Sequence, residues 1–331
     1  MIKFSLCISQ QGLAFDDIAE IALVAEKQGY ESVFIYDHLF SFPYPDVEPF
    51  LECWTTITAL ALKTSRIRVG PLVLNNQYRH PSIVAKMGAT LDVISNGRLI
   101  LGIGAGAKAS GRALRHKRLG YGPEYSAYGI PYPEDAITRI MRLREAVKII
   151  KRIWVEDDPV FKGSFYTINH AICEPKPIQK PHPPIWIGGA GNKLLKVVAE
   201  LADGCNLPWD YTPEECKVKL EYLKKLCKSA GRDYDEIEKS VAVGVVTARD
   251  ERELKKKITS IRKAFNSWYT LNYPPYELRR GGIIGTPSYC IEKIQEFIKS
   301  GVTHFIVSIP ERNKAETLNI LSEEVFPEIH S

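Results

Sequence analysis

Two short stretches of this chain hold residue types that could perform chemistry. In the first, Asp37 and His38 come directly after residues 32–36, an apolar run that is predicted to be a strand. A histidine titrates near neutral pH, so His38 is suited to act as a general acid or base, with Asp37 to orient its ring. The structural alternative is that Asp37 caps a turn and His38 packs beside it.

The second stretch is a glycine turn between a strand and a helix. A short apolar run ends at Gly188, Gly189, Ala190 and Gly191 follow, and an amphipathic helix pattern begins at Asn192. The first turn of a helix presents unpaired N–H groups and the positive end of its dipole, so this turn is suited to bind a phosphate. The alternative is a tight turn that only needs the positive φ of glycine.

The elements that must position these residues alternate along the whole chain. Eight strands that alternate with helices predict a parallel α/β sheet with helical crossovers. A length of 331 residues fits a closed (βα)8 TIM barrel, as one domain over 1–331, better than an open doubly wound sheet. The predicted strands are 4–9, 32–36, 66–74, 98–103, 185–187, 204–207, 241–246 and 304–309, and the clearest helices are 15–28, 55–63, 81–94 and 133–154.

Three stretches depart from this alternation and are long enough to be functional excursions. They are residues 107–133 after the fourth strand, 157–182 before the fifth strand, and 266–284 before the last helix. The first is rich in Gly, Tyr, Arg and Lys, and the third is rich in aromatic residues and proline. The aromatic side chains of the third indicate a substrate with a planar or apolar portion.

The carboxyl ends of the strands, where barrel enzymes place their catalytic groups, hold few ionisable residues. Asn75 follows the third strand, and Gly104 and Gly106 follow the fourth. Asp37 and His38 form the one acid–base pair at a strand end. A mouth so poor in ionisable groups indicates a redox coenzyme that brings its own chemistry.

Composition excludes several classes of function. A net charge of +5 without a clustered basic face argues against nucleic acid, and no apolar run reaches the length of a membrane span. The histidines lack metal-ligand spacing, so no metal site is predicted. Seven scattered cysteines without a C-x-x-C pair indicate reduced thiols in a cytoplasmic protein. The predicted partner is a small molecule.

Five segments together resemble the bacterial-luciferase-like superfamily of flavin and deazaflavin oxidoreductases. The resemblance covers nearly the whole chain, and the run from 79 to 106 is the most specific marker. The segments are YDHLF (36–40), NNQYRHPSIVAKMGATLDVISNGRLILGIGAG (75–106), YSAYGIPYPEDAITRIMRLREAVKIIKRIW (125–154), PPIWIGGAGNKLLKVVAELADG (183–204) and GTPSYCIEKIQEFIKSGVTHFIV (285–307).

Within that superfamily, the Asp-His pair resembles the branch that uses the deazaflavin coenzyme F420. The resemblance implies that His38 lies over the deazaflavin ring, that Asp37 contacts it, and that its phosphate binds at residues 188–192. It also implies a non-prolyl cis peptide at Leu72-Val73, in a bulge that supports the ring. Hydride transfer between F420 and a small organic substrate is the expected activity. Asn75, Gly104 and Gly106 complete the predicted coenzyme site.

Several alternatives stay open at this point. An FMN-dependent monooxygenase on the same barrel is the second hypothesis, and a coenzyme-binding protein without activity is the third. The sugar-phosphate dehydrogenase branch has a Glu where this chain has Ala107, which argues against that reaction by the same route. The resemblance also implies a homodimer that pairs through outer helices near 53–64 and 81–94, with Trp54, Ile57, Leu60 and Ile83 as candidate contacts.

Overall fold

The computed structural model describes residues 1–40, 48–106, 124–209, 211–264, 280–310 and 314–330. The excursions predicted at 107–133 and 266–284 therefore lie largely outside the described residues. The excursion at 157–182 contains a small antiparallel hairpin, formed by strands β6 (Phe161–Lys162) and β7 (Thr167–Ile168).

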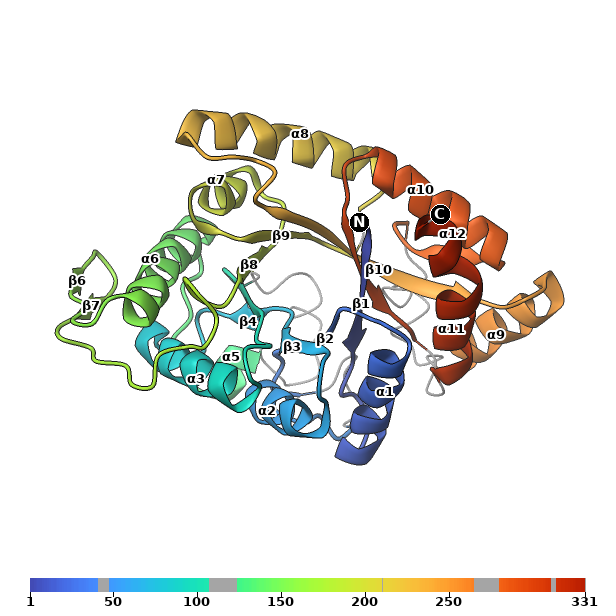
Figure 1. The fold of residues 1–331 in the computed structure, drawn as a ribbon, viewed down its shortest axis with the longest axis horizontal. Coiled ribbons are helices and arrows are strands. Elements are labelled where there is room, and N and C mark those ends of the chain that lie inside the picture. The colour runs from blue at the N-terminus through green and yellow to red at the C-terminus, as the bar shows by residue number, and fades with distance from the viewer. Residues whose placement is uncertain (41–47, 107–123, 210, 265–279, 311–313, 331) are drawn as a thin grey trace.

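Parallel strands form a closed ring at the centre of the molecule, so the predicted TIM barrel is confirmed (Figure 1). The order around the ring is β3-β2-β1-β12-β10-β9-β8-β5-β4, and a short strand β11 (Ile283–Gly285) pairs with β10 outside this path. The ring strands are β1 (Lys3–Ile8), β2 (Ser32–Ile35), β3 (Arg68–Pro71), β4 (Leu74–Asn75), β5 (Leu101–Gly104), β8 (Ile185–Gly188), β9 (Gly204–Leu207), β10 (Glu238–Thr247) and β12 (His304–Ser308).

The third barrel position is one strand interrupted in the middle. β3 pairs with β2, β4 pairs with β5, and the Leu72-Val73 peptide between β3 and β4 is cis. A parallel bridge from Val69 to Leu99, just before β5, closes the ring on the other side of β3. With β3 and β4 counted together, the described ring strands occupy the eight predicted positions, and the predicted cis bond lies at the predicted bulge.

Helices cover the outside of the ring (Figure 1). The predicted start of the long helix at 133 is wrong: α6 begins at Ala136, because the Asp135 carboxylate caps it by accepting the Thr138 N–H at 2.7 Å. The helices are α1 (Phe15–Lys27), α2 (Cys53–Lys63), α3 (Pro81–Ile94), α5 (Glu124–Ala127), α6 (Ala136–Val155), α7 (Asn192–Leu201), α8 (Pro213–Ala230), α9 (Glu251–Ala264), α10 (Pro287–Lys299), α11 (Ala315–Ile320) and α12 (Phe326–His330), with a π-helical turn over Leu321–Val325.

Bulky side chains inside the ring pack against backbone positions that are glycine. The ring centroids of Phe34 and Trp186 lie 5.6 Å apart, and both residues belong to one buried cluster. A Cβ at Gly204 would lie 2.4 Å from the Trp186 ring, and one at Gly70 would lie 2.0 Å from the Ile100 carbonyl oxygen. These two glycines are therefore needed for packing in the barrel interior.

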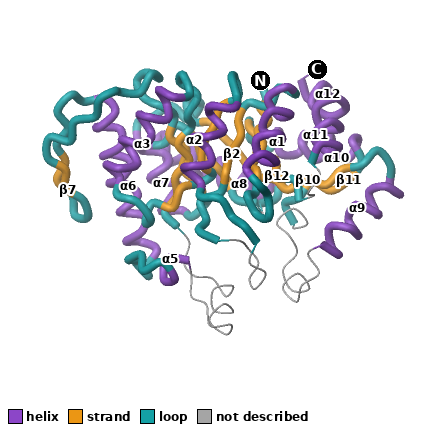
Figure 2. Tube along the Cα trace, turned by 90° about the horizontal axis from the view of Figure 1, so that it is seen from below, coloured by secondary structure: helices purple, strands orange, loops and turns teal. Residues whose placement is uncertain are grey.

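The two ends of the barrel differ in what covers them. The N-terminus and α12 lie at one end, whereas α5 lies beyond the opposite rim, toward which the strands run (Figure 2). The carboxyl ends of the strands thus face the end that holds α5. In the described part of the chain, we find no helix long and apolar enough to cross a membrane.

Candidate active site

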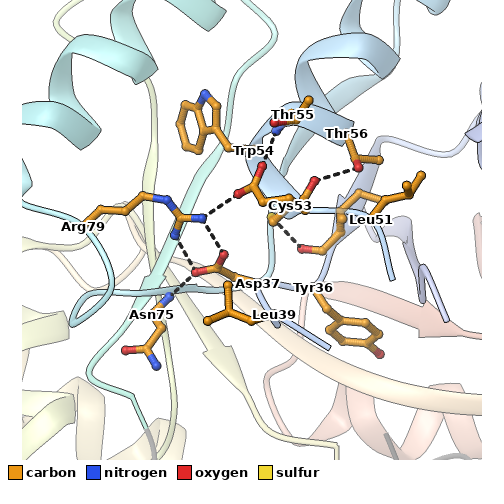
Figure 3. Close-up of polar contacts among 12 residues, drawn as sticks. Tyr36, Asp37, Leu39, Leu51, Cys53, Trp54, Thr55, Thr56, Asn75 and Arg79 are labelled. Atoms are coloured by element: carbon orange, nitrogen blue, oxygen red, sulfur yellow. Dashed lines mark hydrogen bonds and ion pairs between the residues drawn. The ribbon is translucent and has the colours of Figure 1, made fainter. Parts of the chain in front are cut away.

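At the carboxyl end of β2, Asp37 lies in a tight network of hydrogen bonds (Figure 3). The Arg79 guanidinium donates to both carboxylate oxygens, at 2.9 and 3.0 Å, and the Asn75 backbone N–H donates to Oδ2 at 2.8 Å. The Asp37 side chain is only 1% exposed. Such two-fold pairing of an arginine with a carboxylate is among the strongest polar contacts in proteins. The carboxylate of Asp37 is therefore held in place by groups of the protein itself.

His38 points to a second carboxylate, which belongs to the C-terminal part of the 107–133 excursion. Glu124, the first residue of α5, places its Oε1 2.8 Å from Nδ1 of His38. Its Oε2 accepts the Tyr78 hydroxyl at 3.1 Å and the Leu39 N–H at 3.3 Å. Glu124 is 6% exposed, whereas the His38 side chain is 49% exposed. The pair joins a shielded carboxylate to an imidazole that solvent reaches.

This pairing sets the protonation of His38. Partial removal from water lowers the pKa of His38, but the hydrogen bond and charge of Glu124, helped by the charge of Asp37, outweigh it. The pKa of His38 is therefore raised above its ordinary value, and a larger share of the ring is protonated at neutral pH. Burial and the neighbouring Glu124 raise the pKa of Tyr78, which keeps its hydroxyl as a donor.

The bulge at Leu72-Val73 fits into space left by glycines on neighbouring strands. A Cβ at Gly104 would lie 2.8 Å from the Val73 side chain, and one at Gly188 would lie 2.9 Å from it. Leu72 is buried in the barrel cluster, and Val73 packs against that cluster. Gly104 and Gly188 therefore have a packing reason to be glycine, because they leave room for the apolar side chain of Val73.

The predicted phosphate turn joins β8 to α7 without a side-chain cap. Gly189 has a φ of +128°, and Gly191 is the N-cap of α7. A Cβ at Gly191 would meet nothing within 4 Å. Ala190 is buried, and Asn192 accepts a hydrogen bond from Lys219 at 3.2 Å. Open space at an uncapped helix start is the geometry that an anion requires.

Gly106 lies beside the third strand's end and is tightly surrounded. It has a φ of +77°, and a Cβ there would lie 2.1 Å from the Tyr132 hydroxyl and 2.7 Å from Asn75 Oδ1. The buried Arg139 donates to the carbonyls of Pro133 and Glu134 at 2.8 and 2.7 Å. Gly106 and Asn75 thus stand together, as the strand-end prediction placed them, and Tyr132 joins them.

The sequence prediction missed the two charged residues that contact the Asp-His pair most directly. Glu124 is 86 residues from His38 along the chain, and Arg79 is 42 residues from Asp37. Arg79 lies in the marker segment at 79–106, so the resemblance contained a signal for it. Glu124 had none, because no spacing rule links His38 to a residue within the 107–133 excursion. Ala107, where a Glu was missing, lies outside the described residues, but Glu124 brings a carboxylate to His38 from the same excursion.

The donor set of the site is suited to an organic coenzyme. In the described part of the chain, no three His, Cys, Asp or Glu side chains gather closely enough to hold a metal ion. Asn76 Nδ2 and Gln77 Oε1, next to the end of β4, are buried without a hydrogen-bond partner. Buried amide atoms of this kind are expected to find a partner when a ligand is present.

Comparisons with known proteins agree with this geometry. A 5,10-methylenetetrahydromethanopterin reductase of Methanopyrus kandleri is 27% identical, covering 94% of each chain. An F420-dependent glucose-6-phosphate dehydrogenase of Microbacterium testaceum is 27% identical over 99% of this chain and 97% of its own. The solved F420-dependent tetrahydromethanopterin reductase of Methanopyrus kandleri has the same fold, with a TM-score of 0.78 at 24% identity, covering 98% of this chain and 99% of that one. A family model described as luciferase-like monooxygenase matches residues 2–304, so the chain belongs to this family.

Proposed function

We propose that this protein is an oxidoreductase that transfers a hydride between coenzyme F420 and a small organic substrate. The observation that carries the proposal is the His38–Glu124 pair, which lies at a strand end of a barrel that also has the bulge and the glycine turn. The two curated relatives described above are named as a reductase of a pterin compound and as an F420-dependent dehydrogenase. Both names describe two-electron chemistry on a small substrate.

The residues of the chain fit the two ends of such a coenzyme. The uncapped start of α7 at Gly191 has room for a phosphate, which would lie against backbone N–H groups. Val73, packed on Gly104 and Gly188, offers an apolar surface on which a flat ring would rest. The buried amide groups of Asn76 and Gln77 would supply polar contacts near that surface.

His38 performs the proton chemistry in this proposal. When bound, the coenzyme supplies or accepts the hydride, which carries two electrons. Reduction of a substrate also requires one proton, and protonated His38 donates it to the substrate heteroatom next to the carbon that receives the hydride. In the reverse direction, neutral His38 accepts that proton. Glu124 stabilises the charged ring in both directions.

Coenzyme titrations test the proposal. The protein should bind F420 and change its visible spectrum, and the reduced coenzyme should be consumed without oxygen when a suitable substrate is present. A panel of unsaturated carbonyl compounds, short-chain ketones and tetrahydropterin derivatives covers the expected substrates. Failure to bind F420 at micromolar protein would remove the proposal.

An FMN-dependent monooxygenase is the second candidate function, because the family description itself names monooxygenases. The same titration separates the two. Binding of FMN but not F420, with turnover that consumes oxygen, would favour the monooxygenase. The relative named as an F420-dependent dehydrogenase supports the first candidate function.

We further propose that residues 1–331 form one domain and that the protein acts as a cytoplasmic homodimer. All seven cysteines are buried and none forms a disulfide, which supports a reducing compartment. Of the four candidate contacts, Trp54, Ile57 and Leu60 are buried in their own barrel, whereas Ile83 is 55% exposed. Leu62, on the neighbouring helix α2, is 72% exposed and supports the same face. Light scattering at micromolar protein tests the dimer, and a monomeric mass would contradict it.

A further inference from the structure

Two carboxylates flank His38, and the structure gives them different surroundings. Both oxygens of Asp37 already accept hydrogen bonds, from Arg79 and from the backbone of Asn75. To take up or release a proton, Asp37 would have to break a two-fold charged contact in a site where its side chain is 1% exposed. Asp37 is therefore poorly suited to proton exchange.

Arg79 extends this contact to other elements. Its Nη2 atom also donates to Glu52 Oε1 at 2.6 Å, and Glu52 caps α2 by accepting the Thr55 N–H at 2.7 Å. Arg79 itself lies just before α3, whose N-cap is His80. Asp37 and Arg79 together thus connect the end of β2, the end of β4 and the starts of two helices (Figure 3). This arrangement fixes the backbone from which His38 projects.

Glu124 contacts the imidazole itself. Besides the 2.8 Å contact with Nδ1, the Glu124 carboxylate holds the Leu39 N–H, and Tyr128 Oη donates to the Leu39 carbonyl at 3.2 Å. Helix α5 is therefore attached to the residue that follows His38. An ionised carboxylate only accepts hydrogen bonds, so the contact with such a carboxylate favours a proton on Nδ1 of His38.

We propose that Glu124, and not Asp37, is the positioning residue that keeps a proton on Nδ1 of His38, so that Nε2 is the nitrogen that exchanges a proton with the substrate. Asp37 and Arg79 form a separate, structural pair that holds the strand ends. The statement about Nδ1 stands on the contacts alone, whereas the statement about the substrate rests on the proposed function.

The charges around His38 make the two roles separable. Among the described residues, Glu124 faces the ring from α5 and Asp37 from the end of β2, with Tyr78 behind the first and Arg79 behind the second. Glu124→Gln removes one negative charge and keeps the shape of the side chain. A double variant, Asp37→Asn with Arg79→Gln, removes one charge of each sign, so the local net charge stays the same.

Nuclear magnetic resonance of the ¹⁵N-histidine-labelled protein, without coenzyme, tests whether Glu124 keeps the proton on Nδ1 of His38. The His38 signals are identified by their loss in His38→Gln. Glu124→Gln should lower the pKa of His38 by about one pH unit or more and reduce the fraction protonated on Nδ1 in the neutral ring. The double variant removes the smaller contribution of Asp37, so it should lower the pKa of His38 less than Glu124→Gln does. It should leave the fraction protonated on Nδ1 close to that of the unmodified protein and should lower the melting temperature. Equal changes in the two variants, or none in Glu124→Gln, would overturn the proposal.

Turnover with F420 and the first accepted substrate tests whether this arrangement supports proton exchange between His38 Nε2 and the substrate. Glu124→Gln should lower kcat by about 10-fold or more and shift the pH profile of kcat to lower pH, with little change in KM. The double variant should weaken coenzyme binding and shift the pH profile less than Glu124→Gln does. An unshifted profile in Glu124→Gln would contradict the role in catalysis.

A folding control and the resonance experiment keep a failed variant separate from a failed proposal. If Glu124→Gln does not fold, as judged by circular dichroism, Glu124→Asp replaces it. That variant keeps the charge and shortens the reach, so His38 should retain a raised pKa while the Nδ1 contact weakens. If no F420-dependent turnover is found for the unmodified protein, the proposed function fails, whereas the resonance experiment still decides which carboxylate holds the Nδ1 proton.

Discussion

At the scale of single residues, His38 has the features of a proton-exchanging group, and Asp37 has those of a fixed one. His38 is half-exposed, and its Nδ1 contacts the Glu124 carboxylate. Asp37 is enclosed and accepts three hydrogen bonds. The predicted contact between Asp37 and the coenzyme ring stays a prediction, and the hydrogen bonds to Arg79 and Asn75 limit what its side chain is able to reach.

Replacing His38 by Ala should lower turnover while coenzyme binding stays nearly intact. Loss of a positioned acid–base group costs about 10²–10⁴-fold in rate. The glycine turn and the bulge do not involve His38, so coenzyme affinity should change by less than about tenfold, or about 1.4 kcal/mol. A coenzyme titration, a turnover assay and a melting curve check this. Turnover within about threefold of the unmodified protein would exclude His38 from the chemistry.

Replacing Arg79 by Met should destabilise the fold more than removing both members of its pair. A buried charge left without its partner costs about 3–5 kcal/mol, and Arg79→Met leaves Asp37 in that state. Asp37→Asn combined with Arg79→Met should cost less, because no buried charge is left unpaired: the other partner of Arg79, Glu52, has a side chain that is 41% exposed.

Urea unfolding at neutral pH measures this difference. Arg144→Met is a matched control, since Arg144 meets Glu200 in a partly exposed pair at 2.8 Å, and such pairs contribute about 0–1 kcal/mol. A loss in Arg79→Met no larger than that in Arg144→Met would show that the Asp37 contact adds little to stability.

At the scale of elements, the start of α7 is the feature that an anionic ligand would use. Its N-cap, Gly191, has ordinary φ and open space around the position of a Cβ. Gly189, two residues earlier, differs: its φ is +128° and a Cβ there would lie 2.5 Å from Leu194. A substitution at Gly191 therefore tests binding without the strain that one at Gly189 introduces.

Gly191→Asp should weaken coenzyme binding without destabilising the protein. Aspartate is a favourable N-cap and interacts well with the helix dipole, so the melting temperature should stay level or rise. Its charge would repel a phosphate at the same helix start, and the affinity for F420 should fall by about tenfold or more. Gly191→Ser, a neutral N-cap, is the control and should bind more tightly than the Asp variant. Equal affinity of all three proteins would place the phosphate elsewhere.

At the scale of the whole molecule, polar contacts join three neighbouring strands at the end of the barrel opposite the site. Glu238, at the start of β10, accepts hydrogen bonds from Lys3 at 2.6 Å and Thr303 at 3.0 Å. His304 Nδ1 lies 3.7 Å from the same carboxylate, and its Nε2 meets Ser5 at 2.7 Å. These contacts join β1, β10 and β12.

Acid should weaken the fold through this cluster. Burial raises the pKa of Glu238, but the contacts with His304 and Lys3 outweigh it and lower that pKa to about 2. A lowered carboxyl pKa means that the stabilisation is complete above the ordinary value of 4.5 and is lost as the pH falls toward 2. Burial also lowers the pKa of His304, so the charging of this ring destabilises the fold in the same direction.

Glu238→Gln should therefore lower stability at neutral pH and flatten the loss of stability between about pH 4.5 and pH 2. Thermal unfolding over that pH range measures both effects. Glu156→Gln is the control, because Glu156 is half-exposed and its nearest Arg152 nitrogen is 3.7 Å away. If both variants lose stability with acid as steeply as the unmodified protein, Glu238 is not the group that titrates.

The sequence by itself determined the barrel and the two places on it where ligands are expected. Strands and helices follow from local patterns of apolar residues, which need no distant partner, and the eight strand positions were predicted within a few residues. Parallel strands bring their carboxyl ends to one rim, so Asp37, His38, Asn75, Gly104 and Gly188 were expected to lie near one another. The bulge at Leu72-Val73 came from the family resemblance and not from the pattern.

Only the tertiary structure decided which charges meet at that rim. Glu124 and Arg79 reach the Asp-His pair from other segments of the chain, and a hydrogen bond between residues far apart in the sequence leaves no periodic pattern in it. The helix face proposed for dimer contact shows the same limit, since Trp54 and Ile57 are buried against their own barrel. A stripe of apolar residues predicts that these side chains are buried. Which surface buries them depends on how the helices pack in three dimensions.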